Sequence, residues 1–365
     1  MRRAAWVVAI GLLVLAGPAG AQSDLAVEKM MLPVKTIDGV FELEAMIVRP
    51  PGPGPFPLAV ITHGGATNAK LRESVKLPVY RWAVEEFARR GYATVFALRA
   101  GYGSSQGFAP ERRYTRCDFA SDLRIVRMIG RQVAGTIEAV RNLPYVDASR
   151  IVAVGESLGG AGVLAMGEDA IPGLRAIINF SGGIGYHAFG CDREKEADAF
   201  SELGRGNQLP TLWVYAGNDR RFSLALARQL FSAYRSAGGN GQLIELPSFT
   251  EDGHTLFILG APKWRPAVHA FLRGLGLPYD PPPSSITYED MAAYWALMLP
   301  EITKECDKNP TCETTLKCVG EQLEQKTLPL KGLIRLYDVT ATNEAVGAED
   351  SALIRSAIRS CQPTN

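Results

Sequence analysis

The chain of 365 residues contains only four histidines, and it lacks the motifs that commonly bind catalytic metals or nucleotides. It has no H-E-x-x-H pair, no G-x-x-x-x-G-K-S/T phosphate loop and no G-x-G-x-x-G fingerprint after a strand. We therefore expect a protein with no catalytic metal and no cofactor. Internal repeats are also absent, which argues against a propeller.

The sequence has no excess of charge of either sign, with 39 basic and 38 acidic residues. Without Arg2 and Arg3, which belong to a predicted leader, 37 basic residues stand against 38 acidic ones, a formal charge of −1. This balance argues against nucleic acid or an anionic membrane as the main partner.

Long hydrophobic runs are absent beyond the start of the chain. There, Arg2 and Arg3 precede an apolar run over residues 4–16, and small residues follow. This pattern predicts a signal peptide over residues 1–21 with cleavage before Gln22, and its apolar run is too short for an ordinary membrane span. The alternative is an uncleaved N-terminal anchor. We expect an exported protein, periplasmic or extracellular, with no membrane span in its mature form.

All six cysteines follow the predicted signal peptide, so disulfides are expected rather than metal thiolates. The candidate disulfide cysteines are Cys117, Cys191, Cys306, Cys312, Cys318 and Cys361. If residues 311–325 form one helix, Cys312 and Cys318 lie about 9 Å apart along it and on different faces. These two then cannot bridge each other, whereas pairing them with Cys306 and Cys361 would staple the C-terminal region.

Short apolar strands alternate with helical stretches over most of the chain, which predicts a mostly parallel, doubly wound α/β sheet. Residues 28–49 predict a β-hairpin around Asp38-Gly39, and we expect it to form an antiparallel edge. Further strands are predicted over residues 58–62, 92–98, 151–154, 174–180, 211–215 and 242–246. Helices are predicted over residues 73–90, 118–142, 161–167 and 222–237.

The composition changes after this alternating region. Residues 278–285 are rich in proline and predict a linker. Residues 286–365 show helical patterns without strands and contain four of the cysteines. We therefore expect an α/β domain over residues 22–277, the linker, and a small helical C-terminal domain stapled by disulfides, whose partner the sequence does not identify.

A G-x-S-x-G pattern stands between the predicted strand at residues 151–154 and the helix after it. Gly155 and Gly159 flank Ser157, because side chains at those positions would collide with the neighbouring strand and helix. Such a turn lifts the serine hydroxyl out of the sheet and places it near a helix N-terminus, where negative charge is stabilised. We interpret Ser157 as a nucleophile; the alternative is a plain glycine-rich turn.

A nucleophilic serine needs a neighbouring base that a carboxylate orients. Asp219 and His254 each lie in the loop after a predicted strand, where partners of the serine are expected in a parallel sheet. The chain order Ser157, Asp219, His254 predicts a catalytic triad. Asp252 is a weaker candidate for the acid, because it is too close to His254 in sequence to orient it easily.

His63-Gly64-Gly65 follows an earlier predicted strand. We interpret this segment as a source of backbone N–H groups for an oxyanion, rather than His63 as a base. Gly64, Gly65 and Ala66 are alternatives for one donor. The N–H of Leu158, the residue after the serine, is the expected second donor.

Five segments together resemble the α/β-hydrolase superfamily, and most of all the secreted proteins grouped with dienelactone hydrolases. They are His63-Gly64-Gly65, Arg99-Ala100-Gly101-Tyr102-Gly103, Gly155-Glu156-Ser157-Leu158-Gly159, Gly217-Asn218-Asp219 and Asp252-Gly253-His254. The likeness covers about residues 28–275. It implies an α/β-hydrolase fold of about eight strands and a Ser157–His254–Asp219 triad that acts on ester or related acyl bonds. Dienelactone hydrolases proper are usually cytosolic and use a cysteine, so the resemblance implies no particular substrate.

The function predicted from these residues is that of an exported serine hydrolase that cleaves an ester or a related acyl bond through an acyl-enzyme. Its partner would be a small-molecule acyl substrate. The alternatives are a peptidase of the same fold and a non-catalytic binding protein that uses the C-terminal domain. A bridge between Cys117 and Cys191 would pin a lid-like segment over the site, and a mass spectrum with both as free thiols would exclude it.

Overall fold

The computed structural model describes residues 25–66, 68–113, 119–185, 196–279, 310–324 and 361. The predicted signal peptide, Cys117, Cys191, Cys306 and most of the predicted linker and C-terminal domain lie outside these residues. Within the described part of the chain, no helix is long and apolar enough to cross a membrane.

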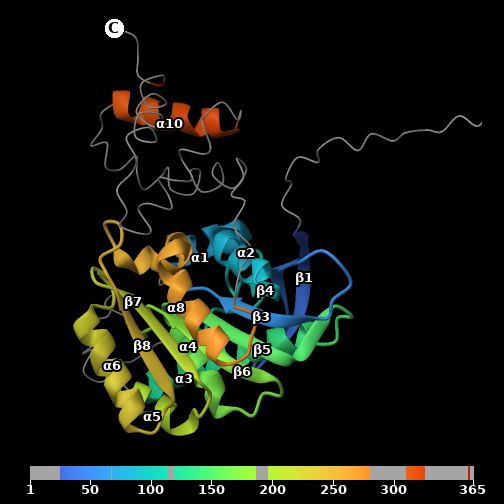
Figure 1. Cartoon of the computed structure of the whole chain (residues 1–365), viewed down its shortest axis with the longest axis vertical. Coiled ribbons are helices and arrows are strands. Elements are labelled where there is room, and N and C mark those ends of the chain that lie inside the picture. Colours follow the sequence, from blue (N-terminus) through green and yellow to red (C-terminus); the bar gives the residue numbers. More distant parts are fainter. Residues whose placement is uncertain are drawn as a thin grey trace, which may run out of the picture.

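An eight-stranded sheet forms the centre of the α/β domain (Figure 1). Its strands lie in the order β1-β2-β4-β3-β5-β6-β7-β8. Strand β2 pairs antiparallel with β1 and β4, and all other neighbours are parallel. The strands are β1 (Ala26–Thr36), β2 (Gly39–Arg49), β3 (Phe56–Thr62), β4 (Ala93–Ala97), β5 (Val146–Glu156), β6 (Leu174–Phe180), β7 (Thr211–Ala216) and β8 (Gly241–Leu246). The predicted mostly parallel sheet with an antiparallel hairpin at one edge is confirmed.

The hairpin of β1 and β2 turns where the Asp-Gly pair predicts it. Ile37 and Asp38 form the turn, and Gly39 has a φ of +130°, a conformation that side chains rarely adopt. On β1, Leu32 and Val34 are buried and alternate with exposed neighbours. Strand β1 therefore turns one face to the core and the other to solvent, as expected at the edge of the sheet.

Helices cover both faces of the sheet, and each face has its own hydrophobic core (Figure 1). Helices α3 to α6 pack on one face, and α2, α7 and α8 pack on the other. The helices are α1 (Ala69–Ser74), α2 (Arg81–Arg89), α3 (Phe119–Val140), α4 (Leu158–Ala165), α5 (Glu196–Gly206), α6 (Leu224–Ser236), α7 (Leu256–Leu259), α8 (Ala261–Gly274) and α10 (Pro310–Glu324). Because both faces are covered, every residue of β4 and β7 is buried.

The single helix predicted over residues 73–90 is wrong. Helix α1 ends early, and α2 begins only after a 3₁₀ turn at Leu77–Tyr80. Pro78 accounts for the break, because proline has no backbone N–H for a helix interior and restricts the residue before it. The interruption places the buried Tyr80 directly before α2, where its hydroxyl reaches the loop after β3.

Helix α10 confirms the helix predicted in the C-terminal region. Cys318 on this helix forms a disulfide with Cys361, and their Cα atoms are 5.6 Å apart, within the usual range for disulfides. Cys318 therefore does not pair with Cys312, as the helical spacing predicts. The partner of Cys312 and the pairing of Cys306, Cys117 and Cys191 lie outside the described side chains.

Candidate active site

Four loops that carry the predicted site residues follow four strands of the sheet. The loops after β3, β5, β7 and β8 contain residues 63–66, Ser157, Asp219 and His254, respectively. These strands run parallel, so the loops at their carboxyl ends lie along the same edge. The topology thus brings residues from distant parts of the sequence to one edge.

Ser157 occupies the sharp turn between β5 and α4. Its φ of 56° and ψ of −126° belong to a sparsely populated region that costs a non-glycine residue roughly 1–3 kcal/mol. It is partly exposed, whereas every other residue from Ile151 to Met166 is buried. The strained turn therefore presents the Ser157 side chain at the surface of an otherwise buried strand–helix unit.

The glycines that flank Ser157 lie where a side chain has no room. A Cβ on Gly155 would come within 2.3 Å of the Gly159 carbonyl oxygen, and a Cβ on Gly159 within 2.3 Å of the His63 carbonyl oxygen. Both contacts are with backbone, which cannot swing aside as a flexible side chain can. Packing therefore requires the glycine spacing of the motif, as the sequence predicts.

His254 and Asp219 form a hydrogen-bonded pair. The Nδ1 atom of His254 lies 3.1 Å from Asp219 Oδ2 and 3.2 Å from Oδ1. Asp219 is fixed in turn by the backbone N–H groups of Arg221 and Phe222, each 2.8 Å from Oδ1. A carboxylate held in this way orients the ring and keeps a proton on Nδ1, so Nε2 is the nitrogen available for proton transfer.

Asp252, the weaker candidate for the acid, contacts the backbone near His254 and not the ring. Its Oδ1 accepts hydrogen bonds from the N–H groups of His254 and Arg220, both at 3.0 Å. Asp252 also caps the 3₁₀ turn at Gly253–Thr255. It shapes the loop, and the geometry favours Asp219 as the carboxylate that orients the imidazole.

The ionisation of His254 and of Asp219 is shifted by their mutual contact. Burial alone would raise the pKa of Asp219, but the hydrogen bond and the charge of His254 hold it below its usual range. Burial alone would lower the pKa of His254, but the hydrogen bond to Asp219 and the negative charges of Glu156 and Asp219 raise it. The ring therefore holds its second proton more tightly than an exposed histidine does.

The Nε2 atom of His254 faces Glu156. Glu156 Oε1 lies 3.3 Å from Nε2, and the Glu156 side chain is only 7% exposed. Among the described residues, no hydrogen bond joins Ser157 Oγ to His254. Serine–histidine contacts are often long in unliganded enzymes and tighten when substrate binds. The structure thus pairs His254 with Asp219. The second residue in contact with the His254 ring is Glu156, which directly precedes Ser157 in the sequence.

Two buried tyrosines fix the loop at residues 63–66. The Gly64 N–H donates to the Tyr80 hydroxyl at 3.1 Å, and the Ala66 N–H donates to the Tyr102 hydroxyl at 2.8 Å. The two hydroxyl oxygens thus accept the hydrogen bonds that the Gly64 and Ala66 N–H groups would have to donate to an oxyanion. Gly64 and Ala66 are therefore poorly placed as oxyanion donors in this conformation.

The N–H of Gly65 differs from its neighbours, because it has no hydrogen-bond partner in the described part of the chain. A Cβ on Gly65 would come within 2.8 Å of the Leu158 side chain, so the two residues lie against each other. Leu158 is the first residue of α4, and N–H groups of a first helical turn have no partner within the helix. Gly65 and Leu158 are thus the best placed of the predicted oxyanion donors.

Arg99 lies buried beside this loop and holds it by its carbonyl groups. Its guanidinium donates to the carbonyl oxygens of His63 and Gly64, the latter at 2.9 Å. It also lies 3.1 Å from Glu111, which accepts a further hydrogen bond from the Tyr102 hydroxyl. A planar guanidinium with several fixed donors suits this role, since each acceptor receives its own N–H.

Both ring nitrogens of His63 are used in contacts with backbone. Its Nδ1 lies 2.7 Å from the Gly64 carbonyl oxygen, and its Nε2 accepts the backbone N–H of Arg99 at 3.0 Å. Burial and the charge of Arg99 lower the pKa of His63 well below its usual value. His63 is therefore a neutral structural residue, in agreement with its interpretation from the sequence.

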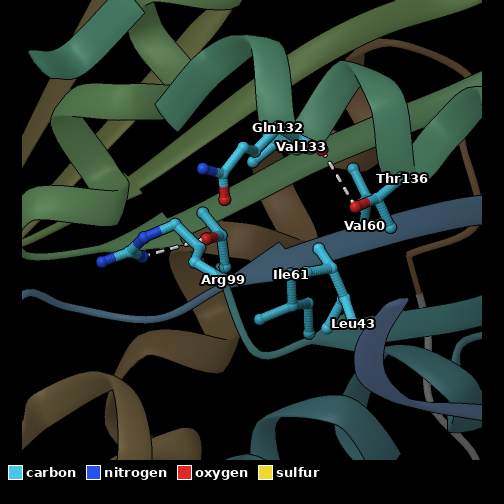
Figure 2. A pocket seen from close by; sticks show the side chains of 9 residues that line it. Leu43, Val60, Ile61, Arg99, Gln132, Val133 and Thr136 are labelled. Carbon is cyan, nitrogen blue, oxygen red and sulfur yellow. Dashed lines mark hydrogen bonds between the residues drawn. The ribbon is translucent and has the colours of Figure 1, made fainter. Parts of the chain in front are cut away.

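A small cavity beside Arg99 lies between β2, β3, β4 and α3 (Figure 2). Its polar lining comes from Thr62, Arg99, Gln132 and Thr136. Its volume of about 10 Å³ is near the minimum for one water molecule. The cavity is thus too small for a substrate and belongs to the packing around Arg99.

Sequence reasoning missed the roles of Tyr80, Arg99, Glu111 and Glu156. Arg99 and Glu156 lie in segments that the resemblance includes, but the motif does not show which way their side chains point. The position of Arg99 after a buried strand was an available signal. Tyr80 had none, because its contact with Glu156 joins residues far apart in sequence. Glu111 lies close in sequence to its partners Arg99 and Tyr102, but no motif marks it.

Comparisons with known proteins find similar solved structures only. No family model matches the chain, and no curated protein matches its sequence. A candidate dipeptidyl aminopeptidase IV from Bacteroides ovatus is 16% identical over 69% of this chain and 36% of that chain, with a TM-score of 0.50. An acetyl xylan esterase from Paenibacillus sp. R4 is 17% identical over 70% of this chain and 86% of its own, with a TM-score of 0.48. A candidate dienelactone hydrolase from Klebsiella pneumoniae is 14% identical over 64% of this chain and 89% of its own, with a TM-score of 0.42.

These identities are low, so the likeness concerns the fold. The strand order and the antiparallel β2 agree with it. The chain has the α/β-hydrolase fold that the resemblance implies.

Proposed function

We propose that this protein is an exported serine hydrolase that cleaves a carboxylic ester through a Ser157–His254–Asp219 triad and an acyl-enzyme. One observation carries the proposal. Ser157 lies in a strained strand–helix turn directly after Glu156, and Glu156 contacts His254, which Asp219 orients. An ester is the first choice because an alkoxide is a better leaving group than the nitrogen anion of an amide, so an ester demands least of the site.

In the first step, Ser157 Oγ attacks the acyl carbonyl carbon while His254 Nε2 accepts the hydroxyl proton. Asp219 keeps Nδ1–H directed at its carboxylate and stabilises the imidazolium that forms. The carbonyl oxygen becomes an oxyanion and accepts hydrogen bonds from the N–H groups of Gly65 and Leu158. Removing one donor of this kind typically lowers kcat by roughly 10²–10³-fold.

The tetrahedral intermediate then collapses: the C–O bond to the alcohol breaks, and His254 gives its proton to the departing oxygen. The acyl group stays on Ser157. Water then attacks the acyl-enzyme while His254 accepts its proton, and the same proton returns to Ser157 Oγ as the carboxylic acid leaves. Every proton is transferred through His254, so the cycle needs no cofactor.

Fluorophosphonate labelling of the mature protein tests the triad without a known substrate. The serine oxygen displaces fluoride from phosphorus, and mass spectrometry locates the adduct. We expect an adduct on Ser157, no adduct in His254→Ala, and labelling slower by about 10³-fold or more in Asp219→Asn. His269→Ala on α8 is the matched control and should label normally. A folded protein that forms no adduct would refute the triad and favour the binding-protein alternative.

Matched substrate panels decide between an esterase and a peptidase. Dipeptidyl p-nitroanilides belong in the amide panel, because one protein of similar fold is a candidate dipeptidyl aminopeptidase. We expect hydrolysis of p-nitrophenyl acetate and butyrate and little hydrolysis of the amides. The opposite preference would assign a peptidase.

Export is part of the proposal. It is supported by the leader pattern at residues 1–21 and by the Cys318–Cys361 disulfide, since disulfides persist mainly in oxidising compartments. Expression of the full chain in a bacterium, followed by N-terminal sequencing of the periplasmic fraction, should find a chain that begins at Gln22. Retention of Met1 in the cytoplasmic fraction would contradict export.

A further inference from the structure

The Glu156 carboxylate has a fixed position that the triad alone does not explain. Its Oε1 lies 3.3 Å from His254 Nε2, and its Oε2 accepts a 2.7 Å hydrogen bond from Tyr80. The same Tyr80 hydroxyl accepts the Gly64 N–H at 3.1 Å. A Cβ on Gly64 would come within 2.5 Å of Glu156 Oε2, so the backbone closes in on the carboxylate. Each of its two oxygens is therefore held in place.

His254 lies between two carboxylates, with Asp219 at Nδ1 and Glu156 at Nε2. A charged imidazolium suits this arrangement, because the neutral ring has only one N–H and no charge to offset the second carboxylate. When Nε2 loses its proton, its lone pair lies close to a carboxylate oxygen 3.3 Å away, and the two repel each other. The charged ring thus fits Glu156, whereas the neutral ring fits the hydroxyl of Ser157.

We propose that Glu156 is a second carboxylate partner of His254, a positioning residue that holds the protonated ring away from Ser157 until the ring is deprotonated. The inference rests on the proposed triad. Ser157 gains its base only after Nε2 has lost its proton, so activity begins at a higher pH than Asp219 alone would set. During the reaction, the same carboxylate stabilises the imidazolium that forms when the serine proton is transferred.

The other charged groups around His254 act elsewhere on the ring or oppose one another. Burial and the charge of Arg221 favour the neutral ring, whereas Asp219 favours the charged one from the Nδ1 side. Asp252 faces backbone N–H groups. Tyr80, which also contacts Glu156, keeps its proton, because burial and the Glu156 charge raise its pKa well above the usual value. Glu156 is thus the charge that acts directly on Nε2.

NMR titration of the histidine rings tests the contact without any need for activity. The chain has four histidines, so the His254 signal can be assigned by its loss in His254→Gln. We expect Glu156→Gln to move the His254 titration midpoint to lower pH. Glu251→Gln is the matched control, because it removes the same charge three residues from His254 at a side chain that is 83% exposed and screened by solvent. An unchanged midpoint in Glu156→Gln would overturn the proposal.

The pH dependence of fluorophosphonate labelling adds the functional readout. Below the wild-type midpoint, Glu156→Gln should label Ser157 about threefold to tenfold faster, because more of His254 is neutral. At pH 9 it should label more slowly, because the imidazolium of the transition state has lost one carboxylate. Glu251→Gln should follow the wild type at both pH values, and parallel profiles for the wild type and Glu156→Gln would contradict the proposal.

Failure of the proposed function can be told apart from failure of this inference. If the wild type never labels but the His254 midpoint moves in Glu156→Gln, the proposed function fails while the contact between the two side chains stands; a positioning role in catalysis is then overturned. If Glu156→Gln does not fold, Glu156→Asp replaces it. The shorter carboxylate withdraws from Nε2, and the midpoint should fall by less; an unchanged midpoint would overturn the proposal in this variant too.

Discussion

Replacement of Arg99 by methionine tests whether one buried guanidinium fixes the loop that carries the proposed oxyanion donor. Arg99 is 2% exposed and donates to the carbonyl oxygens of His63 and Gly64. A trans peptide is planar, so its N–H points opposite to its carbonyl group. The bond from Arg99 to the Gly64 carbonyl therefore aims the Gly65 N–H away from the guanidinium. Methionine keeps an unbranched stem and removes every donor.

The expected loss of stability in Arg99→Met follows from Glu111, the ion-pair partner that stays buried. Breaking a buried ion pair by removal of one member costs about 3–5 kcal/mol, since the other charge stays buried. Glu111 keeps its hydrogen bond from Tyr102, so we expect a loss near the lower limit, about 3 kcal/mol. The double variant with Glu111→Gln should lose less than the sum of the two single variants, because the two side chains are in contact.

Urea denaturation with tryptophan fluorescence measures this loss, since Trp213 and Trp264 are fully buried. In the fraction that stays folded, labelling of Ser157 should slow by about 10²-fold, the effect of misplacing a reacting group by about 1 Å. Arg228→Met removes an arginine from an exposed pair with Glu245 and should change neither quantity. A loss below about 1 kcal/mol for Arg99→Met, or an unchanged labelling rate, would refute the reasoning.

Three further predictions concern the surroundings of Glu156 and the His254–Asp219 pair. Gly64→Ala should lower the free energy of unfolding by about 1–3 kcal/mol, because the added Cβ would come within 2.5 Å of Glu156 Oε2. The control Gly274→Ala should leave it unchanged, because nothing lies within 4 Å of the Cβ position there. Thermal denaturation measures both, and equal Tm values for the two variants would contradict this. The lowered pKa of Asp219 stabilises the folded protein above about pH 3.9, and this stability is lost as the pH falls through the pKa of Asp219 in the folded state. The raised pKa of His254 stabilises the folded protein below about pH 6.5, and this stability is lost as the pH rises through the pKa of His254 in the folded state. Urea denaturation from pH 2 to 9 should show both slopes flattened in Asp219→Asn. Finally, the p-nitrophenyl monoester of succinate should react more slowly than the butyrate, because the negative charge of Glu156 repels its carboxylate. Glu156→Gln should bring the kcat/KM values of the two esters closer together; a constant ratio would contradict the charge effect.

The sheet was predictable because each strand carries a local signal. β6 was predicted with its observed bounds, Leu174–Phe180, since an apolar run enriched in isoleucine fits a strand buried on both faces. The Asp38-Gly39 turn fixed the hairpin. The region before α2 was not predicted correctly, because residues 73–90 have a helical pattern on both sides of Pro78, whereas the proline itself interrupts the helix.

The proposed triad was predictable from chain order, but the neighbour of His254 Nε2 was not. Successive side chains of a strand point to opposite faces, so Glu156 and Ser157 would be expected on opposite sides. The positive φ of Ser157 turns the chain between them, and that conformation is visible only in the structure. The choice among Gly64, Gly65 and Ala66 likewise depends on two tyrosine hydroxyls from other segments.

Two adjacent peptide planes connect the parts of this site, and Arg99 holds both. The plane that contains the His63 carbonyl also contains the Gly64 N–H, which donates to Tyr80 and so supports the carboxylate that faces His254. The next plane contains the Gly64 carbonyl and the Gly65 N–H, which is proposed to bind the oxyanion. Because each plane is rigid, the position of the base partner and the direction of the oxyanion donor depend on one buried side chain. Loss of Arg99 should therefore disturb proton transfer and oxyanion binding together, whereas loss of the Glu156 charge acts on the proton alone.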